Sequence, residues 1–263
     1  MYIFTAKYRY FLRHCAWIAS MHCLWHDFHP THMPSLTIAP RPHPSTPAAS
    51  ACAARKAVFW DRISRKYAAD PIADMAGYEA TLQRVQSLLS VDQDVLEIGC
   101  GTGTTALRLA PSTRQLLATD VSAGMIAIAR EKLAAQSVPQ LSFAVADADA
   151  PVVGQGAYDT VLAFNLLHLV SDLDHALALA VQALRPGGLL ISKTPCIAEM
   201  NPLVPYLALP LMRAIGKAPH VLCFNEEGLK SAITRRGMEI LSVERHGTRG
   251  KDIRVFIVAR KPA

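Results

Sequence analysis

The chain has 263 residues, of which 51% are hydrophobic and 18% are charged, and it contains 14 glycines and 17 prolines. This length allows one or two domains, and the composition excludes a disordered chain and a collagen-like fibre. The net charge is +6, half of which lies in residues 1–50, so the remainder is nearly neutral and has no basic stripe. We therefore expect no nucleic-acid partner.

The cysteines and the hydropathy pattern bear on where the protein works. Six cysteines are scattered along the chain without a Cys-x-x-Cys pair, which is typical of reduced thiols in the cytoplasm. A membrane-spanning helix needs about 20 apolar residues, and the longest candidate stretch, residues 203–215, is interrupted by Pro205, Pro210 and Arg213. We expect a cytoplasmic protein without a transmembrane segment.

Residues 1–50 differ in composition from the rest of the chain. They hold six of the ten histidines, and six prolines fall between residues 30 and 47. Residues 38–51 alternate proline with small residues and lack helix or strand periodicity, which is typical of an extended linker. We predict that residues 1–50 form a disordered extension and that one domain spans residues 51–263.

This extension contains a histidine-rich segment whose spacing is compatible with a metal site. The possible ligands are His22, Cys23, His26 and His29. A metal site needs ligands that are held in place by surrounding side chains, and this segment has few residues that would hold them. A tail without a metal is therefore the preferred interpretation. Translation from Met33, which would omit residues 1–32, is an alternative that the sequence leaves open.

From residue 54 onward, helical and strand patterns alternate along the chain. Apolar runs typical of buried strands are found at 95–98, 115–119, 141–146, 160–164 and 189–193. Amphipathic or helical stretches are found at 54–67, 78–89, 104–110, 123–135 and 173–184. Strands separated by helices of this length connect by right-handed crossovers, so we predict a parallel α/β sheet with helices on both faces.

The last quarter of the chain has a different pattern. A helix is predicted at 225–236, and two strands follow at 238–243 and 253–259. The connection between these two strands is too short for a parallel crossover, so they should pair antiparallel as a hairpin. The predicted architecture is a five-stranded parallel sheet closed by a C-terminal hairpin.

The residues at the end of the first predicted strand carry the most information. The segment 95–104, VLEIGCGTGT, places Gly99, Gly101 and Gly103 where this strand turns into a helix. Glycine is needed where the backbone adopts a positive φ or where a ligand comes too close for a Cβ atom. The amides at the start of the helix face the carboxyl ends of the strands. The spacing matches neither the Walker A pattern nor the G-x-G-x-x-G dinucleotide fingerprint.

Two carboxylates accompany this glycine loop. Glu97 lies in a strand buried on both faces, where a carboxylate is costly unless it accepts hydrogen bonds or faces a cation. A ligand with ammonium and sulfonium groups and no phosphate would suit it, and capping of loop amides is the alternative. Asp120 ends the second strand and can accept both ribose hydroxyls of an adenosine group. Alternatively it caps the next helix, a role for which Ser122 competes.

A third acid, Asp147, follows the third predicted strand. Its carboxylate can accept a hydrogen bond from an adenine amino group, while the backbone N–H of Ala148 can donate one to the adenine ring. Asp149 is an alternative for the same role. The alternative without a ligand is that Asp147 is a solvated loop acid.

These features follow one another as E-I-G-C-G-T-G at 97–103, Asp120, Asp147, the strand and its end at 158–165, and L-R-P-G-G at 184–188. In this order the chain resembles the class I S-adenosylmethionine-dependent methyltransferases over about residues 55–261, and within them the small-molecule branch that includes ubiquinone- and menaquinone-biosynthesis enzymes. The resemblance implies S-adenosylmethionine as cofactor. It also implies a seven-stranded Rossmann-like sheet of order 3-2-1-4-5-7-6, with strand seven antiparallel.

The resemblance further implies a role for each site residue. The methionine portion of the cofactor would lie against Glu97, Gly99, Gly101 and Gly103, the ribose against Asp120, the adenine against Asp147 and Ala148, and the reacting methyl group opposite Asn165. Methyl transfer is an in-line displacement, so a general base is needed only where the acceptor is protonated at neutral pH. His168 is the nearest candidate base, and packing within the apolar run 166–170 is the alternative.

Two segments bear on the methyl acceptor. Methyltransferases of nucleic-acid amines resemble one another in an Asn/Asp-Pro-Pro-Tyr/Phe motif, where this chain has Asn-Leu-Leu-His at 165–168, so a nucleic-acid acceptor is not expected. Residues 194–224 are rich in Leu, Pro and Met, and we interpret them as an insertion that can act as a lid. Their apolar side chains favour a hydrophobic acceptor or contact with a membrane surface, and burial against the sheet is the alternative. Cys196 is interpreted as an ordinary buried thiol.

The sequence therefore predicts methyl transfer from S-adenosylmethionine to a small, hydrophobic molecule. Two alternatives belong to other classes of protein. A non-catalytic cofactor-binding or interaction protein would use the same fold, since fold does not fix function. An NAD(P)-dependent oxidoreductase is disfavoured by the glycine spacing and by the lack of an identifiable proton donor.

Overall fold

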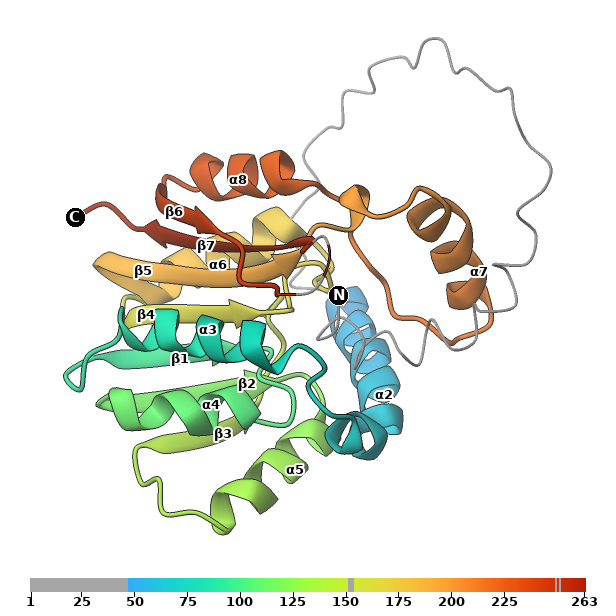
Figure 1. Cartoon of the computed structure of the whole chain (residues 1–263). Coiled ribbons are helices and arrows are strands. Elements are labelled where there is room, and N and C mark those ends of the chain that lie inside the picture. The colour runs from blue at the N-terminus through green and yellow to red at the C-terminus, as the bar shows by residue number, and fades with distance from the viewer. Residues whose placement is uncertain (1–46, 151–153, 249, 251) are drawn as a thin grey trace.

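The computed structural model describes residues 47–150, 154–248, 250 and 252–263 (Figure 1). Its first helix, α2 (Pro47–Ala69), begins inside the segment that the sequence predicted as a linker, so the prediction of extended backbone was wrong over residues 47–51. The reason is the alanine-rich run after Pro47, because alanine favours helix and proline is tolerated at the first helical position. The rest of the predicted extension, including its histidine-rich segment, lies outside the described residues.

A seven-stranded sheet forms the centre of the molecule (Figure 1). Its strands are β1 (Asp94–Ile98), β2 (Gln115–Asp120), β3 (Leu141–Val145), β4 (Tyr158–Phe164), β5 (Leu184–Pro195), β6 (Glu239–Glu244) and β7 (Arg254–Arg260). They lie in the order β3-β2-β1-β4-β5-β7-β6, in which the first five strands are parallel and β7 pairs antiparallel with both β5 and β6. The predicted fold class, strand order and C-terminal hairpin are confirmed.

Helices cover both faces of this sheet (Figure 1). They are α3 (Met75–Gln86), α4 (Thr104–Leu109), α5 (Ala123–Ala134), α6 (Leu173–Ala183) and α8 (Glu226–Arg235). Successive strand residues point to opposite faces, so Val95 joins a core cluster with α3, α4 and α5, while Leu96 joins another with α6 and α8. The carboxyl ends of the parallel strands therefore emerge at one edge between the two layers, where the loops that carry the predicted site residues lie.

Residues 194–224 contain the end of β5, the short turns η2 (Ile197–Glu199) and η3 (Val204–Ala208), and α7 (Leu209–Ala214). Figure 1 shows α7 standing beside the sheet rather than on one of its faces. One side of this insertion is buried in a cluster with Trp60 of α2, through Ile197, Leu209, Met212 and Val221. The other side exposes Leu203, Tyr206, Leu207, Leu211 and Ile215. The insertion is therefore partly buried and partly exposed, and each state applies to a different set of its apolar side chains.

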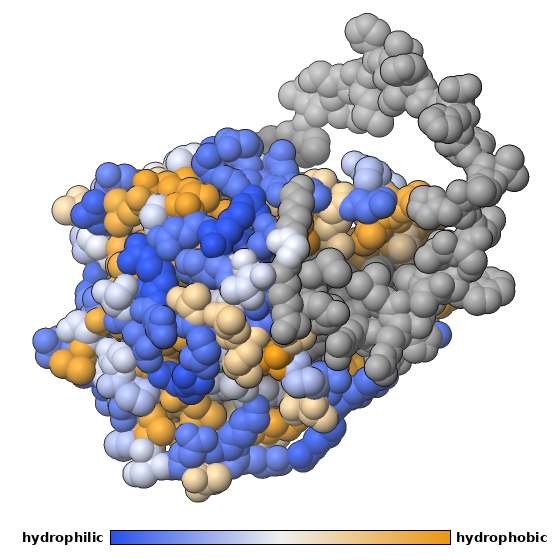
Figure 2. Space-filling model, in the orientation of Figure 1, coloured by the Kyte–Doolittle hydropathy of each residue, from blue (hydrophilic) through white to orange (hydrophobic). Residues whose placement is uncertain are grey.

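The surface is mainly hydrophilic over α3 and α8 on the face that Figure 2 shows, and hydrophobic side chains gather beside α7. We refer to the exposed residues Leu203, Tyr206, Leu207, Leu211 and Ile215 as the apolar stripe. Among the helices that the structure describes, none combines the length and the apolar character that crossing a membrane requires.

Candidate active site

The glycine loop connects β1 to α4 and has the backbone geometry that its sequence predicts. Gly99, Gly101 and Gly103 have φ values of 69°, 58° and 72°, in the left-handed region that glycine tolerates. A Cβ atom on Gly103 would lie 2.6 Å from the ring of Phe143, so this glycine allows close packing of the loop against β3. A Cβ atom on Gly101 would lie no closer than 3.7 Å to Tyr67, which leaves the space beside this residue open.

Two cavities adjoin this loop, and both are lined by Gly99 and Gly101. The larger, of about 130 Å³, lies between α3 and the carboxyl ends of β1, β4 and β5. The smaller, of about 40 Å³, lies between α2 and the loops that follow β2 and β3. Gly103 lines neither cavity, so its position accounts for packing rather than for contact with a ligand.

Asp120 links the smaller cavity to the glycine loop. Its Oδ2 accepts a hydrogen bond from the backbone N–H of Gly101 at 2.9 Å, and its Oδ1 accepts one from Ser122 N–H at 2.9 Å. Ser122 caps α5, since its hydroxyl accepts the N–H of Met125 at 3.0 Å, so the alternative that Asp120 is the cap does not hold. A carboxylate can accept about four hydrogen bonds, and Asp120 therefore retains capacity for a ligand.

The acids after β3 are held by a lysine from α2. Lys56 Nζ lies 2.6 Å from Asp147 Oδ1 and 2.7 Å from Asp149 Oδ2, and both Lys56 and Asp147 line the smaller cavity together with Ala148. Burial by itself would lower the pKa of Lys56, but the hydrogen bonds and charges of the two carboxylates raise it above its usual value. The interpretation of Asp147 as a solvated loop acid is therefore wrong. Ala146 and Val170 complete this part of the lining.

The larger cavity brings together side chains from four elements. Glu97 of β1, which is 2% exposed, lines it with Asn165 at the end of β4. Asn165 has a φ of 52°, and its backbone N–H donates to the carbonyl oxygen of Lys193 at 2.8 Å. Tyr67 of α2 closes the cavity opposite Gly101, and burial, followed by the charge of Asp120, raises its pKa above the usual range. This mixture of carboxylate, amide and phenol groups suits a polar, cationic ligand portion.

The lining residues that were not found from the sequence include Lys56, Tyr67 and Lys193. Trp60 of α2 lines the smaller cavity, and Tyr78 of α3 lines the larger one. The missed residues lie on α2 and on β5, where the local sequence pattern carries no signal of a ligand. Their position becomes visible only when the crossovers bring these elements to the same edge of the sheet.

His168 and Cys196 also line neither cavity. His168 is 1% exposed and lines neither cavity, and its backbone carbonyl accepts the N–H of Leu222 at 2.8 Å. Cys196 is fully buried, and burial raises the pKa of its thiol to about 12, which agrees with the interpretation of an unreactive thiol.

The architecture and the loop recur in known proteins. An S-adenosylmethionine-dependent methyltransferase structure from Mesorhizobium loti matches with a TM-score of 0.58 and 20% identity, over 71% of this chain and 98% of that one. The methyltransferase GfsG of Streptomyces halstedii is 29% identical over 141 residues, or 51% of this chain and 50% of GfsG. The reducing polyketide synthase Preu2 of Preussia isomera is 31% identical over 121 residues, or 43% of this chain and 5% of the synthase. Residues 95–188 match the model of a methyltransferase domain family.

Residues 95–188 therefore carry a methyltransferase domain of this family. The match begins at the second residue of β1 and ends in β5, so it contains the glycine loop and the ends of β2, β3 and β4. The resemblance seen in the sequence is thereby confirmed. The chain spans half the length of GfsG and a twentieth of Preu2.

The lining of the methyltransferase domain fits this cofactor class. Four carboxylates line the two cavities, those of Asp70, Glu97, Asp120 and Asp147. Two lysines do so, of which Lys56 is already neutralised by its ion pairs. A cationic compound without phosphate is favoured over a dinucleotide in such surroundings, because a pyrophosphate would bring two further negative charges close to these carboxylates.

Proposed function

We propose that this protein transfers a methyl group from S-adenosylmethionine to a small, hydrophobic acceptor. The observation that carries the proposal is the meeting of two cavities at Gly99 and Gly101, with Asp120 bonded to the amide of Gly101. The smaller cavity offers carboxylates and apolar side chains to the nucleoside portion of the cofactor. The larger cavity offers the carboxylate of Glu97 and the amide of Asn165 to its amino-acid portion.

In this proposal each lining residue has a part in holding the cofactor. Asp120 accepts the ribose hydroxyls, and Asp147 with the amide of Ala148 meets the adenine. Glu97, Gly99 and Gly101 adjoin the methionine portion, and Asn165 faces the reacting methyl group. Gly103, which the sequence assigned to the methionine portion, acts instead through the packing of the loop. His168, the candidate base from the sequence, lines neither cavity.

The bound cofactor supplies an electrophilic methyl group on a sulfonium, whose departure leaves a neutral thioether. The protein therefore has to align the reactants and exclude water, which is worth on the order of 7–11 kcal/mol in well-oriented reactions. The loop at Gly99–Gly101 and the buried walls from α2 and α3 are suited to that task, because they are fixed by packing and by hydrogen bonds.

A hydrophobic acceptor is supported by the lining of the larger cavity. Its apolar wall comes from Ile72, Leu82, Val85 and Phe164. The relatives GfsG and Preu2 are, by name, a methyltransferase and a polyketide synthase, which fits an apolar small molecule better than a nucleic acid. A nucleic-acid acceptor is also disfavoured because the segment after β4 lacks the proline pair expected of that class.

We further propose that the protein works in the cytoplasm and that the apolar stripe touches a membrane surface from which a lipid-like acceptor is drawn. The stripe is accompanied by Arg213 and Lys217, and no acid occurs between residues 200 and 225. Apolar side chains combined with basic ones favour anionic lipid. Cys100, Cys196 and Cys223 are free thiols, which fits a reducing compartment.

The experiment that tests this function uses S-adenosylmethionine with a labelled methyl group. The protein is incubated with a lipid and quinone extract, and the label is followed into the organic phase. We expect incorporation that stops when S-adenosylhomocysteine is added in excess. Binding of S-adenosylhomocysteine without any incorporation into the extract or into a broad small-molecule panel would instead favour a non-catalytic binding protein.

A further inference from the structure

Lys193 places an amine in the larger cavity without a carboxylate partner. It lies near the end of β5, is 4% exposed, and lines the cavity with Glu97 and Asn165. Its Nζ donates a hydrogen bond to Thr81 Oγ1 of α3 at 2.7 Å. Within the part of the chain that the structure describes, no carboxylate oxygen lies within 4.0 Å of this nitrogen. Burying an ammonium is costly, so burial shifts the protonation equilibrium of Lys193 toward the neutral amine.

Charged groups on the elements packed around Lys193 shift its pKa. Burial and the guanidinium of Arg254 on β7 lower the pKa of Lys193, while Asp252 and Asp74 raise it, and the result is about 8. Arg254 is 2% exposed, and its Nε donates to Asp252 at 2.8 Å, so Asp252 is already engaged by a second cation. The cavity adds the titratable side chains of Tyr67, Asp70, Tyr78, Glu97 and Cys100.

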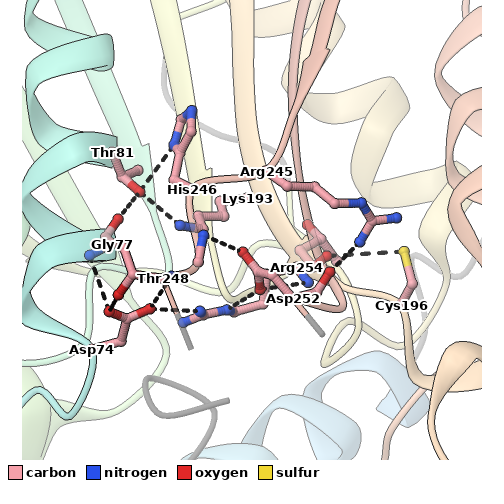
Figure 3. Close-up of polar contacts among 12 residues, drawn as sticks. Asp74, Gly77, Thr81, Lys193, Cys196, Arg245, His246, Thr248, Asp252 and Arg254 are labelled. Atoms are coloured by element: carbon pink, nitrogen blue, oxygen red, sulfur yellow. Dashed lines mark hydrogen bonds and ion pairs between the residues drawn. The ribbon is translucent and has the colours of Figure 1, made fainter. Parts of the chain in front are cut away.

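A chain of polar groups connects this amine to the surface, as Figure 3 shows in part. Thr81 Oγ1 lies 3.1 Å from Nδ1 of His246, and Nε2 of His246 lies 3.1 Å from Glu244 Oε2. The side chain of His246 is 11% exposed and that of Glu244 is 27% exposed. Thr81 Oγ1 also donates to the backbone carbonyl oxygen of Gly77 at 2.7 Å. When this hydroxyl turns from that carbonyl to His246, the hydroxyl, the imidazole and the carboxylate can pass a proton from the cavity to solvent.

We propose that the amine of Lys193 accepts the proton of the methyl acceptor, so that the acceptor is a weak acid with an O–H or an enolisable C–H group. This inference rests on the proposed function. The bond between the acceptor atom and its proton breaks, and an N–H bond forms at Nζ. The electron pair stays on the acceptor atom and forms its bond to the methyl carbon, while the pair of the carbon–sulfur bond remains with sulfur. The resulting ammonium faces any oxyanion and returns its proton through Thr81 and His246.

The test compares Lys193→Arg with the wild type, because arginine keeps the positive charge but cannot accept a proton at these pH values. The acceptors are 3-oxobutanoyl-N-acetylcysteamine for the C–H group and hydroquinone for the O–H group. We expect kcat to fall by about 100-fold or more, as for loss of a general base, with S-adenosylhomocysteine affinity close to wild type. Lys230→Arg, on the exposed surface of α8, is the matched control and should retain full activity.

The pH profile distinguishes a base from a residue that only supports the structure. In the wild type, kcat should rise with pH with a midpoint near 8. Thr81→Val removes a hydrogen bond to the charged form of Lys193, so the midpoint should move to lower pH, since that bond favours the ammonium. Equal activity of Lys193→Arg and wild type, or an unmoved midpoint in Thr81→Val, would overturn the inference.

A measurement on the protein without cofactor keeps the inference separate from the proposed function. The 15N resonance of Lys193 Nζ is titrated by NMR and assigned by its loss in Lys193→Met. A midpoint near 8 supports the inference even where neither probe is methylated, and an ordinary lysine midpoint above 10 overturns it. Failure to bind S-adenosylhomocysteine overturns the proposed function. If Lys193 titrates near 8 but S-adenosylhomocysteine does not bind, Lys193 is a buried amine with a lowered pKa, and it does not act as a base in methyl transfer.

Discussion

At the scale of single residues, our proposal gives Asp120 the central role in binding the nucleoside. Its carboxylate already fixes the loop amide of Gly101 and the turn at Ser122, and in our proposal it also accepts the ribose hydroxyls. Asp120→Ala should weaken S-adenosylhomocysteine binding by about 1–3 kcal/mol, the cost of unpaired hydrogen-bonding groups. Isothermal titration calorimetry measures this change, with Asp92→Ala on an exposed loop as the control. Unchanged affinity in Asp120→Ala would place the ribose elsewhere.

Residues whose role depends on near neighbours could be predicted from the sequence, and residues whose partners are distant could not. Gly101 and Asp120 were found because the turn after a strand restricts both the backbone and the acids beside it. Lys56 and Lys193 were missed because their partners lie 91 and 112 positions away, and no local pattern links them. His168 lines neither cavity, and its role as a base stays a prediction, because three residues along the chain do not fix where a side chain points.

At the scale of elements, α3 is fixed to the sheet through one buried acid. Asp74 caps α3 by accepting the N–H of Gly77 at 3.1 Å, accepts the N–H of Thr248 at 3.0 Å, and lies 3.7 Å from Arg254. Burial alone would raise the pKa of Asp74, but the hydrogen bonds from Thr248 and Gly77 and the charge of Arg254 hold it at about 2. The ionised form is therefore favoured in the folded state.

Asp74→Ala should lower the free energy of unfolding at pH 7 by at least about 1 kcal/mol for the lost cap, and by more because Arg254 loses a counter-charge. A carboxyl whose folded pKa is depressed stabilises the fold above its unfolded pKa, near 4, and loses that contribution as the pH falls toward 2. Denaturant unfolding from pH 7 to pH 2.5 should show the wild-type and variant curves converging. A gap that stays constant with pH would contradict the role of an ionised Asp74.

The elements themselves were largely predictable, since the strands of the parallel sheet are short apolar runs and helices separate them. The start of α2 could not be predicted in this way. Proline followed by small residues is typical of a linker, but the alanines among those residues favour a helix. The insertion at 194–224 was ambiguous for a similar reason. Its apolar side chains do not reveal from their order alone which are buried by Trp60 and which form the stripe.

At the scale of the whole molecule, the apolar stripe lies outside the packed core, and in our proposal it contacts a membrane surface. Tyr206 is 79% exposed, and Leu207 and Leu211 are about half exposed. Replacing these three by serine should abolish sedimentation of the protein with vesicles that contain phosphatidylserine, because both the apolar contact and its alignment with Arg213 are lost. Val91→Ser, at another exposed apolar residue, should bind as the wild type does. Equal binding by the triple variant would show that the stripe has another role.

The central claim is that the two cavities beside the glycine loop bind a cationic adenosyl compound and not a dinucleotide. Calorimetric titration of the full chain with S-adenosylhomocysteine and, separately, with NAD tests it most directly. The site predicts saturable one-to-one binding of S-adenosylhomocysteine and no measurable heat of binding for NAD. Saturable binding of NAD with none for S-adenosylhomocysteine would contradict the account.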